Sequence, residues 1–266
     1  MNTSTTINNN PVGFFDSGVG GLTVYSKFRN KLPNENCLYF GDTKHLPYGN
    51  KTKEELISYA RFILDFFQEQ NVKAVIIACN TSSSAAYDSI KDSYGFKIYP
   101  IIQSCAKILS ELPIKRLGIF ATPATIKSGV YESEIKKYNP DMLIYPQSCH
   151  NWVDIVESNG QNLAENIETV KADLDMMLEN KPDKIVLGCT HYPYLLDVLS
   201  KFTPKDRFID PAEYFVDYIV NDLKSKNLLN SNTQNGYEKM YVSANPNQFK
   251  IASKMFYDVK ELPELV

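Results

Sequence analysis

The stretch KAVIIACNT (residues 73–81) decides the fold, because a run of branched apolar residues ends directly before a thiol and two polar residues. An apolar run without polar alternation predicts a strand buried on both faces, as in a parallel sheet covered by helices. Polar residues that follow such a strand lie where the next helix begins, and ligands of open α/β sheets bind there. Cys79 is therefore either a buried filler or part of a site.

Seven other short apolar runs, separated by stretches of helical periodicity, repeat this pattern. They are VGFF (12–15), CLYF (37–40), KIYP (97–100), RLGIF (116–120), MLIYP (142–146), KIVLG (184–188) and RFID (207–210). TKEE (52–55) has the form of a capping box and predicts the start of a helix. Strands that alternate with helices predict an α/β protein with mainly parallel sheets.

A faint internal repeat predicts two related α/β domains. KAVIIACNT resembles KIVLGCT (184–190), and VGFFDSG (12–18) resembles LGIFATP (117–123) at a similar separation along the chain. We expect a disordered tail at residues 1–11, a first domain built from 12–100 and 211–266, and a second domain from 101–210. A pseudo-two-fold would relate the domains, with the active site in the cleft between them.

Composition and charge argue against several classes of protein. The chain has 266 residues, 43% of them hydrophobic, and a net charge of −3, so nothing favours nucleic acid or an anionic membrane as a partner. Every apolar run is far shorter than the ~20 residues of a membrane span. MNTSTTINNN (1–10) lacks the basic and apolar segments of a signal peptide, so we expect a cytoplasmic protein.

Known cofactor and metal motifs are incomplete or missing in the sequence. The five cysteines form no Cys-x-x-Cys pair, which argues against a disulfide framework and a zinc ribbon. The glycine-rich DSGVGG (16–21) does not complete a dinucleotide fingerprint, because a G-x-G-x-x-G that begins at Gly18 requires glycine where Thr23 stands. No P-loop pattern occurs. We therefore expect neither a metal nor a cofactor.

Polar residues just past the strand ends supply the candidate chemistry. Cys79 and Cys189 each follow a strand, and the field of a helix N-terminus lowers a thiol pKa from its usual ~8.5. His191 can carry a proton beside Cys189, and Asp16 can either tune the first thiol or cap the following helix. Other strand-end candidates are Ser17, Asp42, Thr43, Asn80, Thr81, Thr122 and Thr190. We interpret Cys37, Cys105 and Cys149 as buried fillers.

Two thiols in matched positions, facing one cleft, suit a reaction with mirror symmetry. In a racemisation one base removes a proton from a stereocentre while an acid on the opposite face supplies another, and the roles exchange in the reverse direction. Cysteine can serve as both, because a modest shift brings its pKa near the working pH. Fixed dipoles in a closed site would support the anionic intermediate.

Five stretches carry a resemblance to a known family. They are GFFDSGVGGLTV (13–24), GDTKHLPYGNK (41–51), ACNTSS (78–83), ATPATIKSGVY (121–131) and GCTHYPYL (188–195). With them the sequence resembles the cofactor-independent aspartate/glutamate racemase family, and CTHYP points to its glutamate branch. The resemblance implies interconversion of L- and D-glutamate, supply of D-glutamate for peptidoglycan, and a homodimer.

The resemblance also implies roles for residues at the matching positions. Cys79 would exchange the proton with D-glutamate and Cys189 with L-glutamate, assisted by Asp16 and His191, while Glu157 would be linked to His191. The implied substrate-binding residues are Asp16, Ser17, Tyr48, Gly49, Asn80, Thr81, Thr190 and His191. IIQSC (101–105) departs from the family's usual Glu-Pro-Gly at this place, which puts the turn between the domains and any dimer contact there in doubt.

Two other hypotheses remain open at this point. A hydrolase or transferase with a cysteine nucleophile activated by His191 would need one thiol and would form a trappable covalent intermediate. A non-catalytic amino-acid-binding protein with a two-domain cleft would bind its ligand without isotope exchange at Cα.

Overall fold

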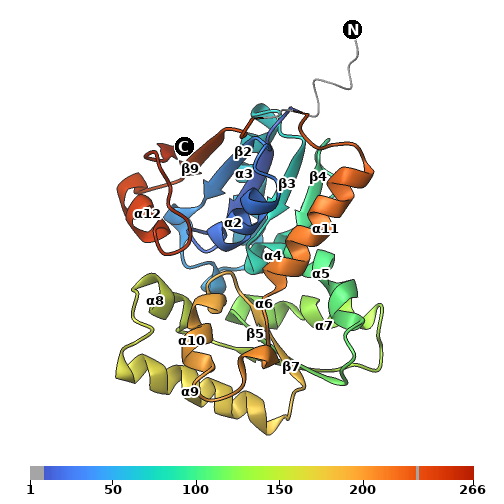
Figure 1. Ribbon diagram of the computed structural model, residues 1–266, viewed down its shortest axis with the longest axis vertical. Coiled ribbons are helices and arrows are strands. Elements are labelled where there is room, and N and C mark those ends of the chain that lie inside the picture. Colours follow the sequence, from blue (N-terminus) through green and yellow to red (C-terminus); the bar gives the residue numbers. More distant parts are fainter. Residues whose placement is uncertain (1–8, 232–233) are drawn as a thin grey trace.

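The computed structural model describes residues 9–231 and 234–266 and contains two parallel sheets, one above the other in Figure 1. The first sheet has six strands: β1 (Val12–Asp16), β2 (Cys37–Gly41), β3 (Ala74–Ile77), β4 (Lys97–Pro100), β9 (Glu238–Val242) and β10 (Glu264–Leu265). The second has four: β5 (Arg116–Ala121), β6 (Leu143–Ser148), β7 (Lys184–Gly188) and β8 (Phe208–Ile209). All eight pairings between these strands are parallel. The predicted α/β class is confirmed.

Both sheets use the same strand order. The first four strands lie in the order β2-β1-β3-β4, and the second sheet has β6-β5-β7-β8, so the first strand of each set is flanked by its second and third. β9 and β10 extend the first sheet beyond β2. Cys79 and Cys189 therefore follow the third strand of their respective sets, as the internal repeat predicts.

Helices and short helical turns connect the strands. The α-helices are α2 (Leu22–Lys31), α3 (Lys53–Glu69), α4 (Asn80–Ile90), α5 (Ile101–Ser110), α6 (Pro123–Ser128), α7 (Val130–Lys136), α8 (Trp152–Glu157), α9 (Ala164–Glu179), α10 (Leu196–Leu199), α11 (Pro211–Ser225) and α12 (Pro246–Ser253). The 3₁₀ turns are η1 (Thr43–His45), η2 (Tyr48–Asn50), η3 (Tyr192–Leu195) and η4 (Lys205–Arg207).

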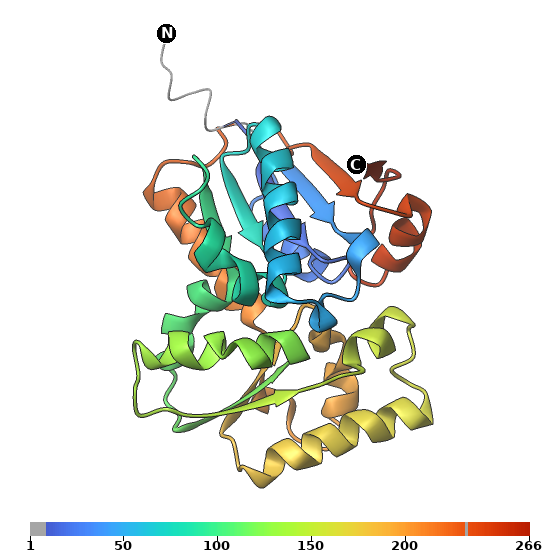
Figure 2. The same cartoon turned by 180° about the vertical axis from the view of Figure 1, so that it is seen from behind.

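The first sheet is buried on both faces. Phe14 and Phe15, adjacent in β1, belong to two different hydrophobic clusters, because successive side chains of a strand point to opposite faces. Helices α2 and α11 pack together on one face (Figure 1), whereas α3 crosses the opposite face, which Figure 2 shows from behind. This two-sided burial explains why the strands read as continuous apolar runs.

The chain crosses between the two sheets twice, through adjacent segments. Helix α5 follows β4 of the first sheet, helix α11 follows β8 of the second, and the two helices pack against each other. Cys105 donates a hydrogen bond to the carbonyl of Pro211 (3.5 Å), which joins the two segments. The domain division at residues 100/101 and 210/211 stays a prediction.

Two further expectations concern the N-terminal tail and membrane-spanning helices. Residues 1–8 of the expected disordered tail lie outside the described residues, but the carbonyls of Asn9 and Pro11 accept hydrogen bonds from Asn36 and Lys73. Residues 9 and 11 of the expected tail therefore make contacts with the first sheet's layer, and the tail itself stays a prediction. Among the residues described, no helix is both long and apolar enough to cross a bilayer.

Helix α3 begins with the predicted capping box. The Thr52 hydroxyl accepts from the backbone N–H of Glu55 (3.2 Å), and the Glu55 carboxylate accepts from the backbone N–H of Thr52 (2.8 Å). Two otherwise unpaired helix-end donors are satisfied in this way.

Thr52→Ala removes this cap, so we expect it to lower the free energy of unfolding by about 1 kcal/mol, measured by urea denaturation. Thr169→Ala is the matched control, because the Thr169 hydroxyl bonds the Glu165 carbonyl inside α9, where alanine is the better helix former. Equal stability losses in the two variants would contradict the capping role.

Candidate functional site

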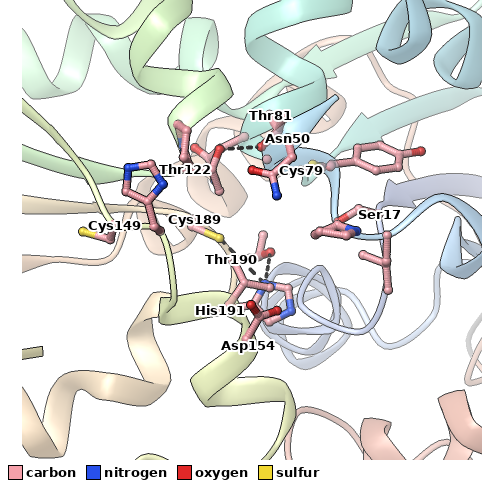
Figure 3. Close-up of a pocket in the computed structure, with 18 residues that line it drawn as sticks. Ser17, Asn50, Cys79, Thr81, Thr122, Cys149, Asp154, Cys189, Thr190 and His191 are labelled. Carbon is pink, nitrogen blue, oxygen red and sulfur yellow. Dashed lines mark hydrogen bonds between the residues drawn. The ribbon is translucent and has the colours of Figure 1, made fainter. Parts of the chain in front are cut away.

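A cavity that is partly open to solvent lies between the carboxyl ends of the two sheets (Figure 3). Most of the residues predicted for the site line it: Ser17, Tyr48, Gly49, Cys79, Asn80, Thr81, Cys189, Thr190 and His191. Asp16 and Glu157 do not line the cavity. Asp16 is fully buried behind it, and Glu157 contacts His191 from the side of a second cavity.

Cys79 occupies the N-cap position of helix α4. Its backbone is extended, and its Sγ accepts a hydrogen bond from the backbone N–H of Ser82 (3.4 Å). The side chain is 5% exposed, so one side of the sulfur faces the cavity while the rest is packed in the core. The junction of β3 and α4 therefore holds the thiol at a fixed point of the cavity wall.

Cys189 and His191 form the second thiol site. Cys189 Sγ lies 3.7 Å from His191 Nδ1, and the Thr190 hydroxyl lies 3.5 Å from the same nitrogen (Figure 3). The other ring nitrogen, Nε2, is 3.0 Å from a carboxylate oxygen of Glu157, the last residue of α8. The imidazole thus lies between a thiol and a carboxylate, an arrangement that suits proton transfer.

Burial and neighbouring charges give the groups around the cavity unusual proton affinities. Burial raises the pKa of Asp16 to about 6, although the positive charge of His191 and backbone hydrogen bonds from Gly18 and Gly21 lower it. Burial lowers the pKa of His191, but hydrogen bonds and charge interactions with Cys189 and Glu157 outweigh this effect and raise it to about 10. At neutral pH Asp16 is largely ionised and His191 protonated.

The start of helix α4 lowers the pKa of the first thiol, as expected, but burial and a neighbouring charge outweigh this effect. The pKa of Cys79 is raised to about 12, first by burial and next by the negative charge of Asp16, and the hydrogen bonds from Ser82 only partly offset this. The second thiol also differs from expectation in its setting, because Cys189 precedes the 3₁₀ turn η3 rather than an α-helix.

Hydroxyl and amide groups from both sheets meet at the cavity. Thr81 and Thr122 face each other at 2.9 Å (Figure 3), and Thr125 lies within 3.3 Å of both hydroxyl oxygens. Asn80 accepts a hydrogen bond from the Tyr131 hydroxyl (2.7 Å). These contacts join α4 below the first sheet to α6 and α7 of the second.

Two glycines of the loop after β1 let the backbone approach the site closely. A Cβ on Gly20 would lie 2.5 Å from the Thr190 hydroxyl and the His191 ring. A Cβ on Gly21 would lie 2.4 Å from the Asp16 Cβ. The loop DSGVGG therefore packs against the second thiol site, which explains its glycines without a dinucleotide.

The stretch HLPYGNK (45–51), which holds the implied binding residues Tyr48 and Gly49, reaches the cavity through η2. Tyr48 donates a hydrogen bond from its hydroxyl to Asp42, which also contacts His45 and accepts from Ser243 (2.6 Å). Gly49 lies against Thr122, with 3.2 Å between the position of a Cβ on Gly49 and the Thr122 Cβ. The loop thus crosses from the first sheet to the second sheet's edge.

Sequence reasoning missed several residues of the cavity wall. They are Pro123, Cys149, His150, Val153 and Asp154, whereas Leu46, Pro47 and Asn50 belong to the same loop (45–51) as Tyr48 and Gly49. Cys149 directly follows β6, so the strand-end argument used for Cys79 applies to it as well, and its interpretation as a buried filler leaves out its place at the cavity. Asp154 lies in α8, where nothing in the sequence marks it.

Ser83, in the first turns of α4, contacts helix α5. The Ser83 hydroxyl donates to the Gln103 side chain (2.8 Å), and the Gln103 amide donates to the Ser83 carbonyl (3.2 Å). The departure IIQSC therefore forms the first turn of α5 and connects it to α4.

Within residues 9–231 and 234–266, no grouping of three or more histidine, cysteine or acidic side chains could hold a metal ion.

The sequence and the fold both match known proteins. The family model described as Asp/Glu/Hydantoin racemase matches residues 21–219. The glutamate racemase of Trichormus variabilis is 40% identical over 83% of this chain and 76% of its own, and that of Carboxydothermus hydrogenoformans is 36% identical over 92% and 91%. The structure of the Francisella tularensis glutamate racemase in complex with D-glutamate superposes with a TM-score of 0.91, at 32% identity over 97% and 98% of the chains.

Glu157 accepts the Nε2 proton of His191, so we expect Glu157→Gln to lower the pKa of His191 from about 10 toward its usual 6.5. The carboxylate stabilises the imidazolium, and a neutral amide stabilises it less. A pH titration of the imidazole carbon signals by NMR measures the shift, with His45 and His150 as internal controls. An unchanged His191 titration would refute the coupling.

Proposed function

The chain belongs to the Asp/Glu/Hydantoin racemase family, and we propose that it interconverts L-glutamate and D-glutamate by proton transfer at Cα between two cysteine bases, Cys79 and Cys189. The observation that carries this proposal is that both thiols, each from the end of a corresponding strand, line one cavity. Its relatives named glutamate racemase support the choice of substrate.

The two thiols provide the two bases that the reaction requires. In the L-to-D direction, the Cys189 thiolate removes the Cα proton of L-glutamate, and the Cys79 thiol delivers its proton to the opposite face of the carbanion. Cys189 ends as a thiol and Cys79 as a thiolate. Exchange of protons with solvent resets the pair, and the reverse reaction uses the same groups in opposite roles.

The residues next to each thiol suit these acid and base roles. A raised pKa of about 12 keeps Cys79 protonated at neutral pH, which matches its role as the acid in the L-to-D direction. Asp16, buried nearby and ionised above about pH 6, can accept a proton when Cys79 must act as a base. His191 lies 3.7 Å from Cys189 Sγ and can exchange a proton with it.

Fixed dipoles around the cavity would stabilise the carbanion and bind the two carboxylates of glutamate. The N-terminus of α4 brings the backbone N–H groups of Asn80 and Thr81, which have no carbonyl partner within the helix, and helix N-termini favour anions. The Thr190 and Ser17 hydroxyls add donors at the cavity wall, and Tyr48 and Gly49 close it on the side of η2. These groups are fixed before substrate binds, so they need little reorganisation during the reaction.

The cellular role and assembly follow from the family resemblance alone. We propose that the D-glutamate supplies peptidoglycan synthesis, that the chain forms a homodimer, and that it acts in the cytoplasm without a cofactor. Sedimentation of the purified protein tests the dimer.

Cys79→Ser and Cys189→Ser should each lower the rate of racemisation by at least ~10²-fold, because a hydroxyl is a far weaker base than a thiolate. Incubation with L-glutamate in D₂O, followed by NMR at Cα and chiral chromatography, measures both exchange and inversion. Cys105→Ser is the matched control, since Cys105 is buried in α5 away from the cavity. Full racemisation by either active-site variant, or a trapped covalent intermediate, would reject the two-base mechanism.

The fall of kcat/KM at acid pH should reflect protonation of the Asp16 carboxylate. Because its carboxylate is ionised only above about pH 6, we expect kcat/KM to fall as the pH drops through 6. Asp16→Asn should lower kcat/KM at neutral pH and remove this fall, whereas Asp154→Asn, which alters an exposed cavity carboxylate, should keep it. A fall near pH 6 that persists in Asp16→Asn would assign it to another group.

A further inference from the structure

We propose that Tyr131 is a positioning residue: its hydroxyl sets the orientation of the Asn80 side chain, so that the amide presents its NH₂ group to a substrate carboxylate. This inference rests on the proposed function, since it concerns how the same cavity binds an anionic amino acid. Tyr131 lies in α7 of the second sheet's layer and does not line the cavity, whereas Asn80 begins α4 and does.

The contact between the two side chains is short and buried. The Tyr131 hydroxyl donates to Asn80 Oδ1 at 2.7 Å, and the side chains are 4% and 3% exposed. Burial raises the pKa of Tyr131 well above its usual value, so the hydroxyl keeps its proton and remains a donor. The contact also crosses between the two sheets' layers, because α4 follows β3 and α7 follows β5.

The other end of the Asn80 amide has no partner among the described residues. Asn80 Nδ2 is buried and makes no hydrogen bond, and an unpaired buried donor costs about 1–3 kcal/mol. Such a group on a cavity-lining side chain has a function if a ligand satisfies it. An anionic carboxylate is the matching acceptor, and hydrogen bonds to charged acceptors are stronger than neutral ones.

The tyrosine hydroxyl discriminates between the two orientations of the amide. If the amide were rotated, Nδ2 would face Tyr131 and the phenolic proton would lose its acceptor. Oδ1 would then be the free end, and its lone pairs would repel a carboxylate. The single hydroxyl therefore favours the orientation that binds an anion.

Tyr131 also contacts the segment that carries the second thiol. A Cβ on Gly188 would lie 3.1 Å from Tyr131 Cε2, so the ring fits closely because Gly188 has no side chain. Gly188 directly precedes Cys189. One side chain thus contacts the residues next to both thiols, and it fixes the Asn80 amide relative to the second thiol segment.

Tyr131→Phe removes only the hydroxyl and tests the proposal. We expect the KM for both glutamate enantiomers to rise about tenfold, the equivalent of roughly 1.4 kcal/mol, with kcat less affected. In an Asn80→Ala background the same substitution should change KM no further, because the amide it orients is absent. Tyr25→Phe is the matched control, since that buried hydroxyl donates to Glu238 (2.7 Å), away from the cavity.

Other variants keep the proposal testable if Tyr131→Phe fails to fold. Asn80→Asp keeps an acceptor for Tyr131 but presents an oxygen to the cavity, so it should weaken binding of D-glutamate more than Asn80→Ala does. Unchanged KM in Tyr131→Phe, an equal effect in the Asn80→Ala background, or weaker loss in Asn80→Asp than in Asn80→Ala would overturn the proposal.

A measurement on the ligand-free protein separates this proposal from the proposed function. The Asn80 side-chain ¹⁵N signal should shift in Tyr131→Phe and stay in place in Tyr25→Phe. If the wild-type protein racemised no glutamate, the proposed function would fall, and this signal would still decide the role of Tyr131. An unchanged signal in Tyr131→Phe would reject that role.

Discussion

The meeting of two sheets at their carboxyl ends is the constraint on which the rest of the structure depends. The residues that directly follow the strands there place polar groups in a region that is largely buried. Buried polar groups require hydrogen-bond partners. Three contacts provide them across the gap: Thr23 to the Thr190 carbonyl (3.0 Å), Thr81 to Thr122, and Tyr131 to Asn80. These bonds hold the two layers in register around the cavity and thereby set where the two thiols stand.

The same burial produces opposite effects on the groups that it encloses. Burial raises the pKa of a carboxyl and of a thiol, and it lowers the pKa of an imidazole. The pKa values of Asp16 and Cys79 are raised, as burial predicts. The pKa of His191 is also raised, because Cys189 and Glu157 are close enough to outweigh the effect of burial. Two thiols in equivalent positions of equivalent sheets thus differ chemically, since one has a carboxylate nearby and the other an imidazole.

Much of the fold could be predicted from the sequence because burial on both faces leaves a plain signal. All eight expected strands are present, and the repeat of KAVIIACNT and KIVLGCT reflects the shared strand order of the two sheets. Strand β10, two residues at the sheet edge, has no such signal. Most of the predicted site residues line one cavity because strand ends share an edge, whereas Asp16 lies behind it and Glu157 contacts His191 from outside it. The pKa of Cys79 could not be predicted, since the sequence does not show that burial and Asp16 outweigh the helix N-terminus. The position of Asp154 at the cavity depends on how α8 lies, which local patterns do not specify.

The shared strand order has a consequence for how such a site can arise. A half-length chain with the order 2-1-3-4 carries one thiol at the end of its third strand, and two copies joined about a symmetry axis would bring two identical thiols to one cleft. Identical copies must give both thiols identical neighbours. When the two halves are joined in one chain, this restriction no longer applies, so each thiol can have different neighbouring residues. A reaction with mirror symmetry can then be carried out by a protein whose two halves differ.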